Sequence, residues 1–364
     1  MKYSEIRVFK YTIPIYNQSF SEREGLLLQT RVAGKELWSE VAPLPSWSKE
    51  TLTEIISFLQ NDLFFSLEML STFPPSLQFG IESLQEQIEQ ENLRLQKAPM
   101  SRPIELQPSL EFETIEKTAQ DVLLIDNPIG ITSPESILQG EKVSLNGLLI
   151  GSLKSMEKRL SQILDNGYTT AKLKIQHLNE DEALGFIKEI KGTIKLRLDL
   201  NKSWDLDQAL HFFSHFSDTD FEYIEEPLKN FSDLKHFPYP IALDESLREI
   251  SMEELQTLPN LKACVVKPTL HGRFASFEPI YQFCKENQKS MILSSSFESG
   301  VGLVQIARLS RKLSIPSCMG LDTYQFLKED VLQAPLFIEK NQLFIPETLV
   351  VNKRKLVEIA RILW

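Results

Sequence analysis

The chain has 364 residues, of which 42% are hydrophobic and 24% charged, a composition typical of a soluble globular protein long enough for two structural units. The formal net charge of −11 argues against nucleic acid or an anionic membrane as a main partner. Because no apolar run reaches the roughly 18 residues that span a bilayer and the amino terminus lacks a signal-peptide core, we expect a cytoplasmic protein with reduced cysteines.

The first hundred residues predict an α+β capping domain. Residues 6–15 alternate apolar and polar side chains, and residues 25–41 contain two strand-like runs that turn at Ala33 and Gly34. Two helical stretches follow, at 49–63 with Ser48 as the candidate cap and at 76–97 after Pro75. Residues 101–140 are hard to place, and we interpret them as the passage into the second unit.

From residue 144 onward, short apolar runs alternate with helical patterns. The eight predicted strands are 144–151, 170–175, 194–201, 221–227, 241–246, 263–269, 290–297 and 318–323. The helical patterns are 152–167, 181–192, 207–216, 251–258, 277–287 and 302–313. This alternation is typical of a (β/α)-barrel. We therefore expect a capping domain over residues 1–105, a barrel over 106–330, and a β-rich segment, 331–364, that packs back on the cap.

Charged residues recur at the carboxyl ends of these predicted strands, where buried apolar runs seldom carry charge. They are Lys172, Lys174, Asp199, Glu225, Asp244 and Lys267. Alternation along a strand puts Lys172 and Lys174 on one face, and it also turns Arg197 inward with Asp199. Barrel enzymes place their chemistry at this end of the strands. The six residues therefore indicate one shared polar site.

Three converging carboxylates repel one another, and a hard divalent cation with oxygen ligands relieves that repulsion. We therefore interpret Asp199, Glu225 and Asp244 as ligands of Mg²⁺, because no histidine or cysteine at these positions points to zinc. The flanking lysines suit proton transfer, and we expect crowding among like charges to lower their pKa values. Taken singly, each of these residues would more often be a surface charge or a helix cap. Only the joint arrangement favours a metal site.

The ordered motifs resemble those of the enolase superfamily and, within it, the o-succinylbenzoate synthases of menaquinone biosynthesis. The matching stretches are EVAPLPSWSKET at 40–51, FGIES at 79–83, KLK at 172–174, RLDLN at 197–201, IEEP at 224–227, DES at 244–246, KPTL at 267–270, SSSFES at 294–299 and GLDTY at 320–324. Each motif is weak alone, whereas the ordered set is specific. The resemblance implies a capping domain on a (β/α)7β barrel.

In such synthases an Mg²⁺-stabilised enediolate forms during syn-dehydration of 2-succinyl-6-hydroxy-2,4-cyclohexadiene-1-carboxylate to o-succinylbenzoate. By position, Lys174 resembles the residue that removes the α-proton and returns it to the departing hydroxyl. Lys267 resembles the lysine on the opposite face, and Lys172 is expected to tune Lys174. The resemblance thus implies a small carboxylate substrate and leaves the oligomeric state open.

Five further residues are expected to contact the substrate. Arg197 is placed to contact a carboxylate or, alternatively, to pair with an acidic neighbour. Ser294, Ser295 and Ser296 line the end of the seventh strand or are ordinary strand-end residues. Trp47 closes over the substrate or packs within the cap. The cap loop departs from relatives, which often read PLPGFS where this chain reads PLPSWS, and Gly272 is followed by Arg273 instead of a second glycine.

Two competing functions stay open. An N-acylamino acid racemase or dipeptide epimerase on the same scaffold would use the same lysines, and Asp322 could supply the acidic group that binds a substrate amine. The sequence also leaves open whether Asp322 organises the lysines or caps a turn, and whether Glu226 supports the site or points away. A catalytically inactive binding protein is disfavoured because no ligand or base is missing. A phosphoryl-transfer enzyme is disfavoured because no glycine-rich phosphate loop is present.

Overall fold

The structure is a computed structural model that describes residues 5–16, 20–61, 67–97 and 140–363. The predicted passage at 101–140, apart from residue 140, and the predicted boundary at residues 105 and 106 lie outside these ranges. None of the described helices is long and apolar enough to cross a membrane. The three cysteines, Cys264, Cys284 and Cys318, are free.

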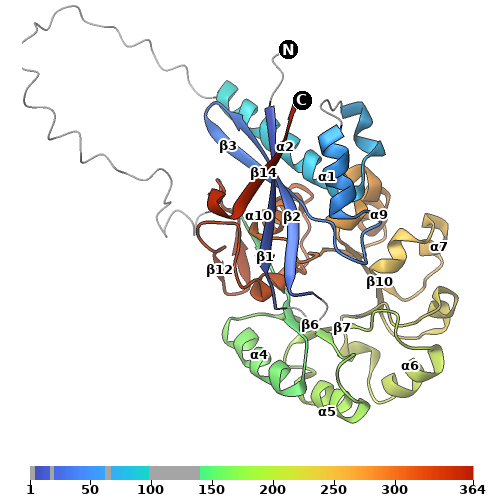
Figure 1. The fold of residues 1–364 in the computed structure, drawn as a ribbon. Helices are drawn as coiled ribbons and strands as arrows, with labels where there is room; N and C mark the ends of the chain where they lie inside the picture. The colour runs from blue at the N-terminus through green and yellow to red at the C-terminus, as the bar shows by residue number, and fades with distance from the viewer. Residues whose placement is uncertain (1–4, 17–19, 62–66, 98–139, 364) are drawn as a thin grey trace, which may run out of the picture.

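The amino-terminal part is an antiparallel sheet in the order β14-β1-β2-β3, with two helices against one face (Figure 1). Its elements are β1 (Glu5–Pro14), β2 (Glu22–Val32), β3 (Lys35–Val41), β14 (Leu356–Leu363), α1 (Leu52–Asn61) and α2 (Pro75–Lys97). The predicted turn is confirmed, because Ala33 and Gly34 both have positive φ between paired strands, as a two-residue hairpin turn requires. The predicted cap of α1 is wrong. Thr51 and Glu54 form the capping box, while the Ser48 hydroxyl accepts a hydrogen bond from the Leu44 backbone.

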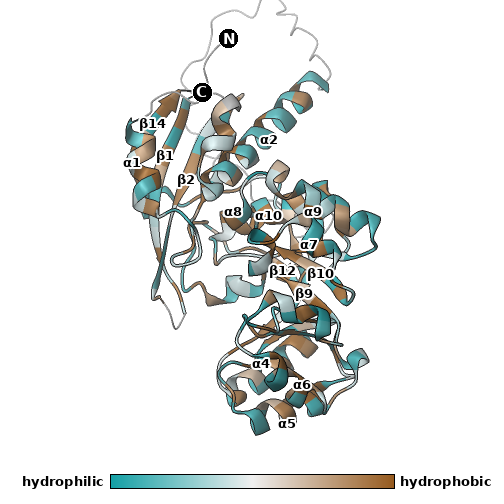
Figure 2. Ribbon diagram, turned by 90° about the vertical axis from the view of Figure 1, so that its right-hand side faces the viewer, coloured by the Kyte–Doolittle hydropathy of each residue, from teal (hydrophilic) through white to brown (hydrophobic). Residues whose placement is uncertain are grey.

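The larger part is a curved, parallel seven-stranded sheet in the order β11-β10-β9-β8-β7-β6-β5. Its strands are β5 (Gly147–Leu149), β6 (Thr170–Lys174), β7 (Lys195–Asp199), β8 (Tyr223–Glu225), β9 (Ile241–Leu243), β10 (Leu261–Val266) and β11 (Ser290–Leu293). The helices are α4 (Leu153–Asp165), α5 (Glu180–Ile190), α6 (Leu206–Phe213), α7 (Met252–Gln256), α8 (Pro268–His271), α9 (Phe274–Glu286) and α10 (Gly300–Lys312). The strands are largely apolar, whereas the helices alternate apolar and polar residues (Figure 2).

The predicted eighth strand at 318–323 is reduced to two isolated bridges. Met319 bridges Leu145 beside β5, and Gly320 bridges Ser294 beside β11, so this short segment joins both edges of the sheet. The Asn146 amide donates to the Met319 carbonyl at 3.0 Å, and the Gly320 amide donates to the Leu293 carbonyl at 2.9 Å. The barrel is therefore closed, and its eighth strand is reduced to two bridged residues. The fold is the predicted (β/α)7β barrel with an α+β cap.

The predicted first strand, 144–151, is divided between two sheets. Residues up to Ser144 form β4 (Lys142–Ser144) in a small sheet of order β12-β13-β4 with β12 (Ile338–Glu339) and β13 (Gln342–Phe344). The last strand of the chain, β14, pairs antiparallel with β1 from Glu5 opposite Leu363 to Tyr11 opposite Leu356 (Figure 1). The predicted division of the chain at residues 330 and 331 stays a prediction.

A buried carboxylate joins the cap to the barrel. Glu40 of β3 accepts hydrogen bonds from the Gly302 amide at 2.8 Å, the Ser299 amide at 3.0 Å and the Tyr11 hydroxyl at 2.5 Å. These two amides lie at the start of α10, where backbone N–H groups have no intrahelical acceptor. A carboxylate at this end also interacts favourably with the helix dipole. Glu40 therefore caps a barrel helix from another domain.

We expect Glu40→Ala to lower the free energy of unfolding by about 3 kcal/mol, because it leaves several buried donors without an acceptor. Guanidinium denaturation measures this change. Glu36→Ala on the same strand is the control, since its partly exposed pairs with Arg31 and Lys353 should be worth less than about 1 kcal/mol. Equal losses in the two variants would show that Glu40 has no special role.

Candidate active site

The sheet register aligns the predicted site residues at one end of the barrel. Lys174 of β6 lies opposite Asp199 of β7, which lies opposite Glu225 of β8. Asp244 follows β9 directly. The residues that alternate with them, such as Leu173 and Leu198, pack in the helix-facing core. The acidic side chains therefore face the barrel interior at the carboxyl ends of three neighbouring strands.

Each carboxylate is paired with a lysine. Lys172 Nζ lies 2.8 Å from Asp199 Oδ2 and 2.6 Å from Glu225 Oε1, and Lys174 Nζ lies 2.8 Å from Asp199 Oδ2. Lys267 pairs with Asp244. Since β6 and β10 are separated by three strands in the sheet, Lys174 and Lys267 approach the acidic cluster from opposite sides. The structure thus brings together all six residues of the predicted site.

Burial and like charge control the ionisation of this cluster. Burial, together with the negative charges of Asp199 and Asp244, raises the pKa of Glu225 to about 8 despite the nearby Lys172. Burial opposes ionisation of Asp199 as well, but the ammonium groups of Lys172 and Lys174 hold its pKa below the usual range. The expectation that crowding lowers the lysine pKa values is wrong for Lys172 and Lys267. Although burial opposes it, the surrounding carboxylates raise the pKa values of both.

The carboxylate oxygens of Asp199, Glu225 and Asp244 are the kind of ligand that a hard divalent cation prefers. All three carboxylates are buried, and Glu225 Oε2 has no hydrogen-bond partner among the residues that the structure describes. In the arrangement seen, no three His, Cys, Asp or Glu side chains of the described ranges converge on one ion position. The lysine ammonium groups engage the carboxylates instead. Binding of an ion to Asp199, Glu225 and Asp244 therefore requires these ion pairs to rearrange.

Two neighbours of the cluster have conformations that the sequence did not reveal. Glu226 has a φ of +44°, and its carboxylate accepts from the Asp244 amide at 2.8 Å and the Ser246 amide at 2.8 Å. It therefore fixes the turn that carries Asp244, which answers the question left open by the sequence. Asn201, with a φ of +43°, accepts from Lys174 Nζ at 2.9 Å through its amide oxygen. Asn201 also donates to Glu245 at 3.2 Å, so it orients Lys174.

The three serines differ in what their hydroxyl groups contact. Ser294 Oγ donates to the Gly320 carbonyl at 3.2 Å, and Ser295 Oγ lies 2.6 Å from Thr323 Oγ1. Both therefore hold the segment that closes the barrel. Ser296 Oγ is buried and has no hydrogen-bond partner within the described part of the chain. Of the three, Ser296 is therefore the one whose hydroxyl has no partner among the described residues.

Arg197 lies deeper in the barrel than the acidic cluster. It donates to Glu222 at 2.8 Å, to Asn146 Oδ1 at 3.0 Å and to the Cys318 carbonyl at 2.8 Å, and it is 1% exposed. Each of these three partners immediately precedes a strand or the closing segment, which places the guanidinium at the amino-terminal end of the barrel. This position counts against a substrate contact and favours the alternative, a pair with an acidic neighbour.

Trp47 covers Lys267 from the cap. The ammonium group of Lys267 lies 5.7 Å from the centre of the Trp47 ring, a cation–π distance, and the ring is 41% exposed. Arg248, which follows the turn after Asp244, donates to the Trp47 carbonyl at 3.0 Å. Arg23 donates to the Pro43 carbonyl at 2.7 Å and to the Phe297 carbonyl at 3.2 Å. Sequence reasoning missed both arginines, because no local pattern marks a cation that bonds to distant carbonyl oxygens.

We expect Arg248→Met to loosen the cap loop around Trp47. Loss of one charge-assisted hydrogen bond, worth about 1.5 kcal/mol, should accelerate amide hydrogen exchange of Trp47 and Ser48 by about tenfold. Exchange of both amides can be followed by mass spectrometry of peptides from residues 40–51. Arg354→Met, at an exposed position away from the loop, is the control. If amide exchange in Arg248→Met were unchanged, the hydrogen bond from Arg248 would not stabilise the cap loop.

Asp322, left open by the sequence, is fully engaged by protein groups. Its two oxygens lie 2.9 and 2.8 Å from Arg159 Nη2, and Oδ2 also accepts from the Leu148 amide at 2.7 Å and from Gln325 at 2.7 Å. Asp322 therefore ties the closing segment to β5 and α4. It presents no free carboxylate oxygen for a substrate amine.

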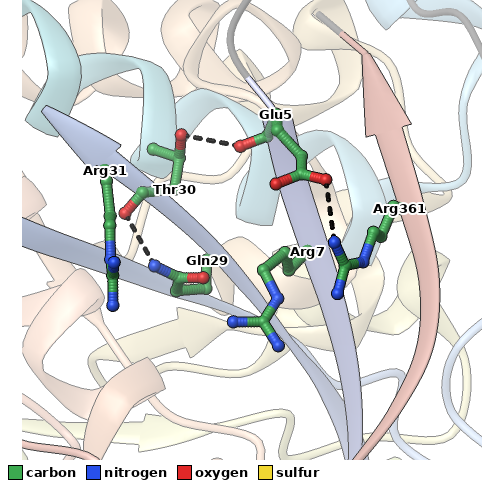
Figure 3. A pocket seen from close by; sticks show the side chains of 6 residues that line it. All are labelled: Glu5, Arg7, Gln29, Thr30, Arg31 and Arg361. Carbon is green, nitrogen blue, oxygen red and sulfur yellow. Dashed lines mark hydrogen bonds and ion pairs between the residues drawn. The ribbon is translucent and has the colours of Figure 1, made fainter.

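A separate hollow of about 280 Å³ lies on the face of the cap sheet opposite α1 and α2 (Figure 3). Its three arginines are already paired with acidic side chains: Arg7 with Glu358, Arg31 with Glu36, and Arg361 with Glu5 and Glu358. It shares no residue with the lysine–carboxylate cluster. We assign it no role in the chemistry.

Two family models and a curated relative match the sequence of this chain. The family model described as enolase C-terminal domain-like matches residues 155–349, and the MenC N-terminal domain model matches residues 3–88. The chain is 26% identical over 355 residues to the o-succinylbenzoate synthase of Pectobacterium atrosepticum, covering 90% of this chain and 93% of that protein.

Two solved structures show the same fold. An o-succinylbenzoate synthase from Thermosynechococcus elongatus BP-1, complexed with Mg in the active site, is similar with a TM-score of 0.64 and 21% identity over 92% of this chain and 97% of that one. A dipeptide epimerase from Enterococcus faecalis V583 is similar with a TM-score of 0.70 and 16% identity over 96% of this chain and 98% of that one.

Proposed function

Because the chain belongs to the enolase superfamily, we propose that it is an o-succinylbenzoate synthase, a carbon–oxygen lyase. The reaction converts 2-succinyl-6-hydroxy-2,4-cyclohexadiene-1-carboxylate to o-succinylbenzoate and water. One observation carries the proposal: lysines from opposite sides of the barrel pair with the three carboxylates of one buried cluster. The curated relatives named as such synthases support the choice of reaction.

The proposed ligands of Mg²⁺ are Asp199, Glu225 and Asp244. When bound, the ion supplies positive charge beside the substrate carboxylate, which stabilises the enediolate that forms after proton removal. Lys172, paired with both Asp199 and Glu225, offsets part of the negative charge of the ligand set.

We assign proton transfer to Lys174. Its amine removes the proton α to the carboxylate, and the resulting ammonium group then gives that proton to the departing hydroxyl on the same face. One C–H and one C–O bond break, the ring becomes aromatic, and water leaves. Asn201, which accepts a hydrogen bond from Lys174 Nζ, holds the amine in position between these two steps. Lys267, on the opposite side, provides charge that stabilises the enediolate.

The substrate contacts stay proposals. Ser296 is the serine whose hydroxyl has no partner in the described part of the chain, and the Trp47 ring beside Lys267 would shield the reacting atoms from water. We do not assign a substrate contact to Arg197, because its position suits the structural ion pair with Glu222.

A dipeptide epimerase is the alternative on this scaffold, and its lysine pair would be the same. The engagement of Asp322 by Arg159 counts against it, since the carboxylate that could bind a substrate amine is already neutralised. An ultraviolet assay for aromatisation of the cyclohexadiene tests the proposal. Incubation with L-Ala–L-Glu in D₂O tests the alternative, because epimerisation exchanges the α-hydrogen. Deuterium exchange without aromatisation would replace the proposed reaction by the alternative.

A further inference from the structure

A large cavity lies between the cap and the barrel, with a volume of about 840 Å³. It forms where α2, β3, the end of α10 and the segment after Val331 approach one another (Figure 1). None of its lining residues belongs to the lysine–carboxylate cluster. Its size is within the range of small-molecule sites, which occur preferentially at domain interfaces.

One cation in this cavity, Arg308, forms no direct ion pair, although the carboxylate of Glu141 lies near enough to interact with its charge. Arg308 donates to Gln87 Oε1 at 3.0 Å and to the Pro346 carbonyl at 3.0 Å, and no carboxylate of the described ranges forms an ion pair with it. These two bonds engage two of the five N–H groups of a guanidinium. Burial lowers the pKa of Arg308 to about 10, so the group is still charged at neutral pH.

The other cations of the cavity differ from Arg308 in having partners. Lys35 pairs with Glu91 at 2.9 Å, and Arg94 pairs with Glu347 at 2.7 Å. Arg308 is therefore the position in this cavity where an added anion gains a charge-assisted hydrogen bond without breaking an existing ion pair.

One wall of the same cavity is apolar. Phe344 and Leu349 line it as buried side chains, and Phe337 and Val350 leave 42% and 43% of their surface exposed. Exposed apolar side chains that gather in a concavity typically mark a ligand-binding groove. The combination of an apolar wall and one unpaired guanidinium is complementary to a molecule with an apolar body and a single anionic group.

We propose that this cavity is a second ligand site, distinct from the proposed catalytic site, and that it binds a small aromatic or aliphatic carboxylate. The carboxylate contacts Arg308, and the apolar body lies against Phe337, Phe344 and Leu349. The proposal stands on the cavity alone and does not depend on which reaction the barrel site performs.

Isothermal titration with 2-naphthoate tests the site, with the uncharged 2-naphthamide as the matched probe. We expect Arg308→Gln to weaken 2-naphthoate binding by about tenfold, the effect of losing one charge-assisted hydrogen bond. Arg354→Gln, at an exposed position outside the cavity, should change binding less than about twofold. The native protein should bind 2-naphthamide about as weakly as Arg308→Gln binds 2-naphthoate.

Two further variants keep the test decisive. The double variant Lys174→Ala, Lys267→Ala removes cations of the barrel site and should retain 2-naphthoate binding. Because Arg308 also contacts α2 and the carboxyl-terminal segment, Phe337→Glu at an exposed position of the wall provides an independent test and should abolish binding by repulsion. Absence of binding at millimolar probe, unchanged affinity in both Arg308→Gln and Phe337→Glu, or loss of binding in the double lysine variant would each overturn the proposal.

Discussion

Replacing Lys174 with alanine is expected to lower the rate of the proposed dehydration by about 10³-fold or more, because general acid–base catalysis typically contributes 10² to 10⁴. Both proton transfers are assigned to this one amine, so no second group of the cluster replaces it. The fold should persist, since Lys172 still pairs with Asp199 and Glu225. The measurement is steady-state aromatisation at saturating substrate, with Mg²⁺ affinity determined separately by calorimetry.

Lys202→Ala is the matched control for this experiment. Lys202 lies on the loop after β7, and its ammonium group pairs with Glu249 away from the acidic cluster. We expect this variant to keep its rate within about twofold and its stability within about 0.5 kcal/mol, as for a surface pair. Turnover of Lys174→Ala close to that of the control would refute the role assigned to Lys174.

Exhaustive chelation is expected to abolish turnover, and added Mg²⁺ should restore it. The lysines compensate much of the acidic charge, so the chelated protein should keep its circular dichroism spectrum while it loses activity. Substitution of one ligand, Glu225→Gln, should raise the Mg²⁺ concentration for half-maximal activity by at least about tenfold, comparable to the smallest effects reported for groups that support metal ligands. Glu36→Gln, on the cap, should leave that concentration unchanged. Full turnover after chelation would exclude the metal from the mechanism.

The strands that carry the site could be predicted from the sequence because two simple regularities coincide there. Alternation along TAKLKI and RLDLN distinguishes inward charges from outward leucines, and parallel strands bring their carboxyl ends together. The register that aligns Lys174, Asp199 and Glu225 agrees with these two regularities. The pairing of strands that are distant in the sequence could therefore be predicted where the local alternation of apolar and polar residues was strong.

Other features depend on information that periodicity does not contain. Alternation shows that Arg197 faces inward, but the strand end that its side chain reaches depends on Glu222 and Asn146, which precede other strands. The positive φ of Glu226 could not be predicted from the sequence, because glutamate rarely adopts a positive φ. For α1 the signal was present, because Thr51 and Glu54 have capping-box spacing, whereas Ser48 lies too early.

The eighth strand shows a different limit of prediction from the sequence. The run at 318–323 has the composition of a strand, yet only Met319 and Gly320 form bridges, and Asp322 begins a 3₁₀ turn. Side-chain contacts replace the missing ladder: Asp322 binds Arg159, and Thr323 binds Ser295. Composition indicates that a segment prefers to be extended, but the neighbours decide how much of it pairs.

The pairing of β14 with β1 affects how this protein can be synthesised. The outermost strand of the amino-terminal sheet, β14, is synthesised long after β1, so β1 has an unsatisfied edge until β14 emerges from the ribosome. A nascent chain can therefore build most of its barrel before the sheet of the cap has all four strands. Premature termination near residue 350 would therefore yield an aggregation-prone product in which β1 is free to pair with another molecule.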